Sequence, residues 1–356
     1  MTPQAARRER FSAVLRERGI DAAYVGRLVN VRYLTGYTGS NGAVLVHADG
    51  PAVFATDGRY KDQAAAEVPD LERTITRDLV GALVGRVVSG VLGVETHALS
   101  VDSHHGLATQ AAGVELRSLD RLVEQLREVK DETEIDALRR ACEISTRALE
   151  QLLAGPLVGR SEGMIARDLE NAMFDLGAEG IAFETILAAG PNSAIPHHSP
   201  GEREVAPGDF VKIDFGARVD GYHADCTRTI VVGAPQDWQR EIYAAVKAAQ
   251  EGGLDDLREG LKVAASRATV ERILGDAGWL EYFSTGLGHG VGLEIHEDPF
   301  LGPKHPGKLV SRTALTMEPG IYLPGRGGVR IEDTAVVTKG APEVLTTMTK
   351  DLLELA

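Results

Sequence analysis

In the first third of the chain, short apolar runs alternate with stretches whose apolar residues recur at helical spacing. Phe11, Val14 and Leu15 fall on one face of the charged stretch 4–18, which predicts an amphipathic helix that ends at Gly19. Because short strands that alternate with helices are typical of an α/β domain, we predict that architecture here. Strands are expected at residues 22–25, 43–46, 52–55 and 91–95, and helices at residues 60–68 and 104–112.

Near Arg127 the pattern changes to longer amphipathic helices, and we place the domain boundary just before this point, around Glu124. Asp131 is expected to cap one of them, with Glu134 as its capping-box partner, because a glutamate three residues after the cap can bond back to the cap's backbone. Further helices are expected at residues 161–176, 239–250 and 263–277. We therefore predict two domains, residues 1–123 and residues 124–356.

The stretch FVKIDFGARVDGYHADCTRTI, residues 210–230, predicts a β-hairpin with an aspartate in each strand. If the chain turns at Val219 and Asp220, Asp214 lies directly opposite Asp225, with the two Cβ atoms roughly 5 Å apart. Like charges repel at that distance, so a divalent metal ion between them is one explanation. The alternative is that the aspartates lie at turn or edge positions in water. The apolar neighbours of Asp214 favour the metal, because a buried unpaired charge is costly.

Composition limits the class of protein. The 356 residues are 43% hydrophobic, which is enough to bury a core in a globular chain of two domains. A formal net charge of −14 argues against nucleic acid and anionic membrane as partners. We find neither a signal-like apolar segment at the start nor an apolar run of the ~20 residues that span a membrane, so we expect a soluble cytoplasmic protein. Two cysteines, Cys142 and Cys226, are too few for a disulfide framework and are expected to be buried.

Three further candidate ligands follow the hairpin, each in a separate motif. His289 lies between glycines in TGLGHGVGLEIHEDP, Glu318 lies in LTMEPGIYL, and Glu332 lies in GGVRIEDTAVV. With Asp214 and Asp225 they make an oxygen-rich set of four carboxylates and one imidazole, which suits manganese, cobalt, iron or zinc. Four carboxylates carry enough charge for two divalent ions, which in such sites lie roughly 3.5–4 Å apart.

These five residues, in this order and spacing, resemble the ligands of the pita-bread metallopeptidases, the family of methionine aminopeptidase, aminopeptidase P and prolidase. With YLTGYTGSNG and ATDGRY in the first domain, the chain is most similar to the Xaa-Pro branch, and within it to small bacterial aminopeptidases P. The resemblance implies an α/β N-terminal domain followed by an α+β pita-bread catalytic domain. It also implies two divalent metal ions, most often manganese, substrates that are proline-containing peptides, and a homodimer.

The resemblance implies a role for each ligand. Asp225 and Glu332 would bridge both metal ions, Asp214 would bind one ion, and His289 and Glu318 would bind the other. A metal-bridging hydroxide would attack the Xaa-Pro carbonyl, with Glu318 as the proton carrier between water and the leaving nitrogen.

Three catalytic residues are implied in the same way. His197 of the IPH motif and His296 of the EIHE motif would hold the substrate carbonyl and the developing oxyanion. Arg330 would line the site, and because it shares a strand face with Glu332 we expect it to orient that ligand.

Four neighbouring residues are open to a structural interpretation. Thr227 and Tyr222 either hydrogen-bond to the ligands or serve only the fold, and His223 and His198 are expected to be ordinary structural or surface histidines.

One departure from the family pattern leaves the substrate open. The usual H-G-T-G-H motif reads Thr285, Gly286, Leu287, Gly288, His289 here, so the customary first histidine is missing. The leading hypothesis is an Xaa-Pro aminopeptidase, and the alternative is prolidase, which cleaves Xaa-Pro dipeptides. A metal-free peptide-binding protein is a third possibility, although such a protein would be expected to lose ligands.

Overall fold

The computed structural model describes residues 1–303 and 305–355 and divides into two compact units, Met1–Arg127 and Glu128–Ala356. The division falls within helix α6 (Leu122–Glu128), four residues beyond the expected end of the first domain at residue 123. Leu122 and Val123 are buried, and Arg127 donates a hydrogen bond to Asn30 Oδ1 at 2.8 Å. These contacts attach most of α6 to the first unit.

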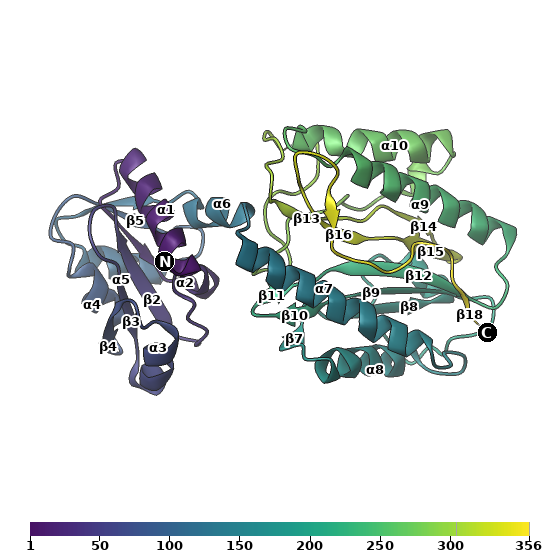
Figure 1. The fold of residues 1–356 in the computed structure, drawn as a ribbon, viewed down its shortest axis with the longest axis horizontal. Helices are drawn as coiled ribbons and strands as arrows, with labels where there is room; N and C mark the ends of the chain where they lie inside the picture. Colours follow the sequence, from purple (N-terminus) through teal and green to yellow (C-terminus); the bar gives the residue numbers. More distant parts are fainter. Residues whose placement is uncertain (304, 356) are drawn as a thin grey trace. The chain divides into compact units, whose positions relative to one another are not determined.

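The first unit is built on a six-stranded sheet of order β4-β3-β2-β1-β5-β6. The β1–β2 and β2–β3 pairs are antiparallel, and the other pairs are parallel. The four predicted strands are β1, β2, β3 and β5, and the mainly polar β4 and β6 were not predicted. The elements, drawn in Figure 1, are α1 (Pro3–Glu17), β1 (Ala22–Val25), α2 (Leu28–Thr35), β2 (Gly42–His47), β3 (Val53–Thr56), α3 (Lys61–Glu67), β4 (Glu72–Ile75), α4 (Leu79–Val84), β5 (Val91–Val94), α5 (Val101–Gln110) and β6 (Glu115–Ser118).

In the second unit, two pairs of helices cover sheets that lie between them (Figure 1). One apolar cluster joins α7 (Glu132–Leu153) and α8 (Glu162–Asp175) to the central strands, and another joins α9 (Asp237–Asp256) and α10 (Ser266–Asp276) to the later strands. The strands are β7 (Gly180–Ile181), β8 (Ile186–Ala189), β9 (Phe210–Phe215), β10 (Ala217–Val219), β11 (Tyr222–His223), β12 (Cys226–Val232), β13 (Ala314–Met317), β14 (Gly320–Leu323), β15 (Gly327–Arg330), β16 (Asp333–Val336), β17 (Glu343–Val344) and β18 (Glu354–Leu355).

The predicted helix start at Asp131 is confirmed. The Asp131 side chain accepts from the Glu134 amide at 3.1 Å, and Glu134 Oε2 accepts from the Asp131 amide at 2.9 Å. Cys142 and Cys226 are both fully buried, as expected. Within the described ranges, no helix is long and apolar enough to cross a membrane.

The predicted register of the hairpin is wrong by two residues. Strands β10 and β11 pair Val219 with Tyr222, so the turn is formed by Asp220 and Gly221, whose φ angles are 51° and 83°. Positive φ at both central residues is the conformation of a type I′ turn, for which an Asp-Gly pair is well suited. Asp214 therefore lies opposite Thr227, and Asp225 is a diagonal neighbour just before β12.

Candidate metal centre

All five predicted metal ligands line one cavity of about 180 Å³ in the second unit. They come from separate places in the chain: β9, the residue before β12, the loop before β13, the residue after β13, and the connection between β15 and β16. His197 and His296 line the same cavity. The lining residues are Phe183, Ile186, His197, Asp214, Asp225, His289, Ile295, His296, Glu318 and Glu332.

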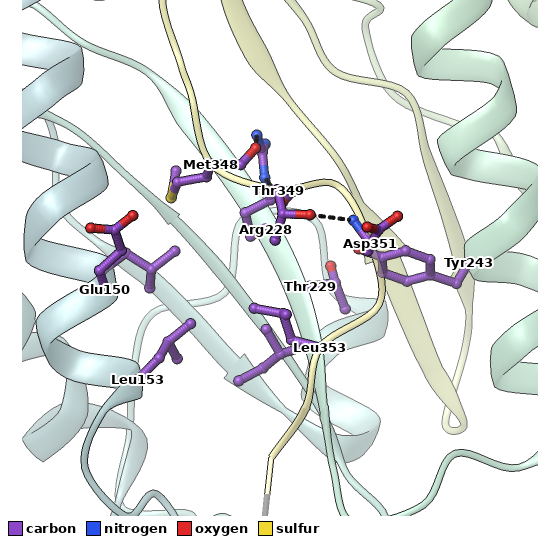
Figure 2. A pocket seen from close by; sticks show the side chains of 11 residues that line it. Glu150, Leu153, Arg228, Thr229, Tyr243, Met348, Thr349, Asp351 and Leu353 are labelled. Atoms are coloured by element: carbon purple, nitrogen blue, oxygen red, sulfur yellow. Dashed lines mark hydrogen bonds between the residues drawn. The ribbon is translucent and has the colours of Figure 1, made fainter.

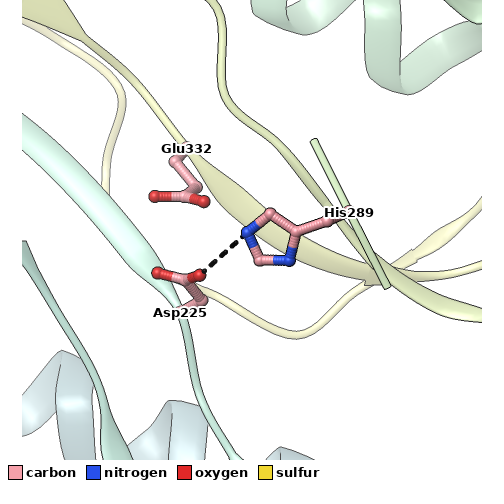
Figure 3. A group of neighbouring side chains, drawn as sticks. All are labelled: Asp225, His289 and Glu332. Carbon is pink, nitrogen blue, oxygen red and sulfur yellow. Dashed lines mark ion pairs between the residues drawn. The ribbon is translucent and has the colours of Figure 1, made fainter. Parts of the chain in front are cut away.

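Asp225, His289 and Glu332 form the tightest group. One ligand atom from each lies within 4.8 Å of the others, and Figure 3 shows their side chains pointing toward one another. His289 Nε2 is 3.5 Å from Asp225 Oδ2 and 3.6 Å from Glu318 Oε1. This imidazole and these carboxylates are close enough to share a cation.

The backbone around His289 fixes its ring. His289 Nδ1 lies 3.0 Å from the carbonyl oxygen of Gly290, which can only accept, so Nδ1 carries the proton and Nε2 presents its lone pair to the carboxylates. A Cβ at Gly288 would lie 2.1 Å from the Thr316 carbonyl oxygen, and one at Gly290 would lie 2.3 Å from that of Asp298. The glycines on both sides are therefore needed for close backbone approach.

Burial and mutual repulsion perturb the acidities of these groups. Burial, followed by Glu332 and Asp214, raises the pKa of Asp225 well above its usual value, and burial, followed by Glu318 and Asp214, does the same for the pKa of Glu332. Burial raises the pKa of Glu318 to about 7 and lowers the pKa of His289 to about 4. The carboxylates crowd one another, and the imidazole is neutral, as a metal ligand must be.

Arg330 is buried and connects several parts of the site. It forms an ion pair with Asp214 Oδ2, donates to Tyr322 Oη at 2.8 Å, and donates from Nε to Thr227 Oγ1 at 3.1 Å. Thr227 in turn donates to Glu332 Oε2 at 2.7 Å. Arg330 thus contacts Asp214 directly and reaches Glu332 through Thr227, which resolves the open interpretation of Thr227 in favour of a ligand contact.

A metal fits this donor set. The second oxygen of Asp214, Oδ1, is buried and has no hydrogen-bond partner among the described residues, although a buried carboxylate oxygen normally has one. A cation beside Asp214 Oδ1 and the crowded carboxylates would satisfy that oxygen and reduce the repulsion. The chain therefore has a candidate carboxylate and histidine metal site.

The two predicted substrate-binding histidines lie at the open side of the cavity. The rings of His289 and His296 are 4.4 Å apart between centroids, and both His197 and His296 are exposed. Desolvation, and then the proximity of His197, lowers the pKa of His296. A group bound in the cavity would meet both imidazoles beside the carboxylates.

Three residues whose role the sequence left open, Tyr222, His223 and His198, contact groups other than the five candidate ligands. Tyr222 donates to Glu134 Oε1 at 3.0 Å, which links it to α7, and His223 bonds through Nδ1 to the Gly292 carbonyl oxygen at 3.0 Å. His198 Nε2 lies 2.8 Å from Glu162 Oε2. The structural interpretation of His223 and His198 is supported by these contacts. Leu287, at the departure from the family motif, is fully buried in the apolar core.

Sequence reasoning missed four buried charged residues near the site, Lys130, Glu162, Lys212 and Glu297. Glu162 accepts from the Ala189 amide at 2.8 Å and from the Gly201 amide at 3.1 Å, at the two ends of the loop that carries His197. Lys130 pairs with Glu297 at 3.1 Å, next to His296. Lys212 lies in β9, two residues before Asp214. A lysine within the apolar run FVKIDF was the one available signal for Lys212.

A second, smaller cavity of about 80 Å³ lies away from the ligands, beside Arg228 and the segment that leads to β18 (Figure 2). Arg228 donates to the Thr349 carbonyl oxygen at 2.9 Å, to Asp333 Oδ1 at 2.7 Å and to the Glu332 carbonyl oxygen at 2.6 Å. These bonds tie the C-terminal segment to the backbone that carries Glu332.

Comparison with protein families assigns both parts of the chain. Residues 136–339 match metallopeptidase family M24, and residues 7–129 match the Creatinase/Prolidase N-terminal domain. An Xaa-Pro dipeptidase of Pyrococcus furiosus is 32% identical over 98% of this chain and 99% of its own length.

Solved structures agree over the whole length. The Xaa-Pro dipeptidase from Bacillus anthracis superposes with a TM-score of 0.94 at 36% identity, covering 99% of this chain and 100% of that one. The X-Pro aminopeptidase from Thermotoga maritima gives a TM-score of 0.90 at 33% identity, covering 98% of this chain and 99% of that one. The expected fold, an α/β domain followed by a pita-bread domain, is confirmed. The chain belongs to metallopeptidase family M24, the pita-bread metallopeptidases, with a creatinase/prolidase N-terminal domain.

Proposed function

We propose that this protein hydrolyses the peptide bond before proline and that Xaa-Pro dipeptides are its principal substrates. The observation that carries the proposal is the convergence of four carboxylates and three histidines on one cavity. The activity is suggested by the similarity of almost the whole chain to Xaa-Pro dipeptidases. The sequence analysis put the aminopeptidase first and prolidase second, and these relatives favour the reverse order.

An Xaa-Pro aminopeptidase is the second candidate, and one feature of the cavity favours it. A dipeptide brings a free carboxylate close to the reacting bond, where a cationic side chain would stabilise it. Among the described residues that line the cavity there is no lysine or arginine, so only His197 and His296 could take that role. The similarity to the X-Pro aminopeptidase from Thermotoga maritima points the same way.

We propose that the five candidate ligands hold two divalent metal ions and that these ions are manganese. Asp225 and Glu332 would bridge the ions, Asp214 would hold one, and His289 and Glu318 would hold the other. Cobalt, zinc and iron also suit these ligands. When bound, the ions supply a water whose pKa is lowered and polarise the carbonyl under attack.

The chain's own residues would do the rest of the reaction. His197 and His296 donate hydrogen bonds to the carbonyl oxygen as negative charge develops on it. Glu318 accepts a proton from the attacking water and returns it to the proline nitrogen as the carbon–nitrogen bond breaks. Arg330 holds Asp214 directly and Glu332 through Thr227, and so keeps the two carboxylates in place.

The substrate's proline has a natural place in the cavity. Its nitrogen is a tertiary amide without a hydrogen, so recognition depends on the ring rather than on an N–H donor. Phe183, Ile186 and Ile295 supply an apolar wall beside the histidines, against which a pyrrolidine ring can pack.

The test compares Ala-Pro with Ala-Pro-Ala, with Ala-Ala as the control that lacks proline, on protein loaded with Mn²⁺ whose metal content has been measured. We expect kcat/KM for Ala-Pro to exceed that for Ala-Pro-Ala by about 10-fold or more, and Ala-Ala to be a poor substrate. A faster reaction with the tripeptide would establish the aminopeptidase instead. Failure of metal-loaded protein to cleave either proline substrate would refute the proposed function.

We also propose that the protein is a cytoplasmic homodimer that binds proline-containing peptides and neither nucleic acid nor membrane. The net charge of −14 supports the exclusion of polyanionic partners. Light scattering measures the mass in solution, and a monomer at micromolar concentration would contradict the dimer.

A further inference from the structure

We propose that Lys212 is a positioning residue that holds the backbone just before His197 and thereby sets the place of that imidazole in the cavity. The inference rests on the proposed function, because it assumes that His197 contacts the substrate. It assigns a role to a residue that supplies no metal ligand.

Lys212 is fully buried in β9, between Val211 and Ile213, which are also fully buried. A buried amino group is costly unless it is well paired, and no carboxylate among the described residues forms an ion pair with it. An apolar residue would suit such a position in the strand better. The cost of keeping a lysine here indicates that its polar contacts serve a purpose.

The hydrogen bonds of Lys212 all go to one short segment, and its Nζ also lies 5.2 Å from the centre of the Tyr322 ring. Lys212 Nζ donates to the Ile195 carbonyl oxygen at 2.5 Å and to the Pro196 carbonyl oxygen at 3.1 Å, and these are the two residues directly before His197. Side chains two apart share a strand face, so Lys212 reaches this segment from the face that also carries Asp214. One strand thus supplies a metal ligand and fixes the neighbouring loop.

A second donor ties the same carbonyl to the ligands. Arg330 Nη1 donates to the Pro196 carbonyl oxygen at 3.2 Å, and the same guanidinium pairs with Asp214. Pro196 is therefore held from two sides, by Lys212 and by Arg330. These two hydrogen-bond donors hold the backbone before His197 at a fixed distance from the metal ligands. Without them, the loop would be held mainly by the hydrogen bonds of Glu162 to the Ala189 and Gly201 amides at its two ends.

The His197 side chain itself is not restrained. It is exposed, and within residues 1–303 and 305–355 no hydrogen bond reaches its ring. Ile195 is 47% exposed, so packing does little to hold this segment. The placement of His197 before substrate binds is thus determined by its backbone, and Lys212 holds that backbone.

The test is a double-mutant cycle with Lys212→Met, which keeps the length of the side chain and removes its donors, and His197→Ala. We expect Lys212→Met to lower kcat/KM by about 10- to 100-fold, mainly through kcat, as displacement of a substrate-contacting group does. If Lys212 acts through His197, the double variant is no worse than His197→Ala alone. Hydrogen exchange of residues 193–199 should become faster in Lys212→Met, while the number of bound Mn²⁺ ions is unchanged.

The controls separate this role from a structural one. Lys247→Met removes a partly exposed lysine paired with Asp351 and should change neither kinetics nor exchange in the loop. If Lys212→Met does not fold, Lys212→Gln keeps a shorter donor and is measured in the same cycle. Additive effects, or unchanged exchange of residues 193–199, would overturn the inference. Inactive wild-type protein would instead refute the proposed function, whereas the exchange measurement still tests Lys212.

Discussion

Thr227 offers a sharp test of how the ligand carboxylates are held. Its hydroxyl is fully buried, donates to Glu332 Oε2 at 2.7 Å and accepts from Arg330 Nε at 3.1 Å. Thr227→Val keeps the shape of the side chain and removes both hydrogen bonds. The Glu332 carboxylate then loses the donor that orients it toward Asp225 and His289.

The magnitude follows from the kind of bond removed. A hydrogen bond to a charged group contributes about 1.5–3 kcal/mol. At about 1.4 kcal/mol per tenfold change in a binding constant, its loss should weaken metal binding by about 10- to 100-fold. The assay is calorimetric titration of Mn²⁺ into protein stripped with a chelator, with urea unfolding as a parallel measure of stability.

The chain supplies a matched control two residues along the same strand. Thr229 is buried on the same face of β12, and its hydroxyl donates to the Arg330 carbonyl oxygen at 3.0 Å and accepts from the Arg330 amide at 3.2 Å. Thr229→Val should lower stability by about 1–3 kcal/mol and leave metal affinity within a few fold of wild type. Equal metal affinities for Thr227→Val and wild type, or equal losses in both variants, would refute the reasoning.

Two further predictions concern buried charges. In metal-free protein, the stability of wild type relative to Glu318→Gln should fall by roughly 1–3 kcal/mol as pH rises from about 5 to about 8. The reason is that burial raises the pKa of Glu318 to about 7, so the folded chain holds that proton more tightly than the unfolded chain. Urea unfolding at each pH measures the difference in stability between the two proteins, and a difference that does not change with pH would contradict the prediction. Lys130→Met removes the ammonium group that pairs with the buried Glu297 carboxylate and should lower the free energy of unfolding in urea by about 3–5 kcal/mol. The surface control Lys247→Met should lower it by less than about 1 kcal/mol. Similar losses in the two variants would contradict a stabilising role for the buried ion pair.

The five candidate ligands, which the structure brings to one cavity, could be singled out from sequence because each is a charged or imidazole side chain placed among apolar or glycine residues. Asp214 interrupts an apolar strand, and His289 lies between two glycines at which any added Cβ would clash with a backbone oxygen. The start of α7 was equally readable, since Asp131 and Glu134 form a local motif that needs no distant contact. Features that depend only on residues close together in the chain can therefore be predicted from the sequence.

What depends on geometry between segments was harder to predict. The hairpin register was wrong because the turn was centred one position too early, although the Asp220–Gly221 pair was itself the stronger turn signal. That one position moved the partner of Asp214 from Asp225 to Thr227. The direct partner of Arg330 was missed for a similar reason, because its ion pair with Asp214 joins β15 to β9.

Strands β4 and β6 and the role of Lys212 show a second limit. The two strands lie at the edges of the sheet in the first unit and are largely polar, so no apolar run marks them. The hydrogen-bond acceptors of Lys212 are two backbone carbonyls, which any sequence would supply, and only the fold brings them to its amino group.

The most direct test of the central claim is the number of divalent ions bound by wild type, Asp225→Asn and Asp214→Asn, measured by titrating Mn²⁺ into metal-free protein. If Asp225 bridges and Asp214 binds one ion, wild type binds about two ions per chain, Asp214→Asn retains about one, and Asp225→Asn binds neither tightly. Two tightly bound ions in Asp225→Asn, or none in wild type, would contradict the account.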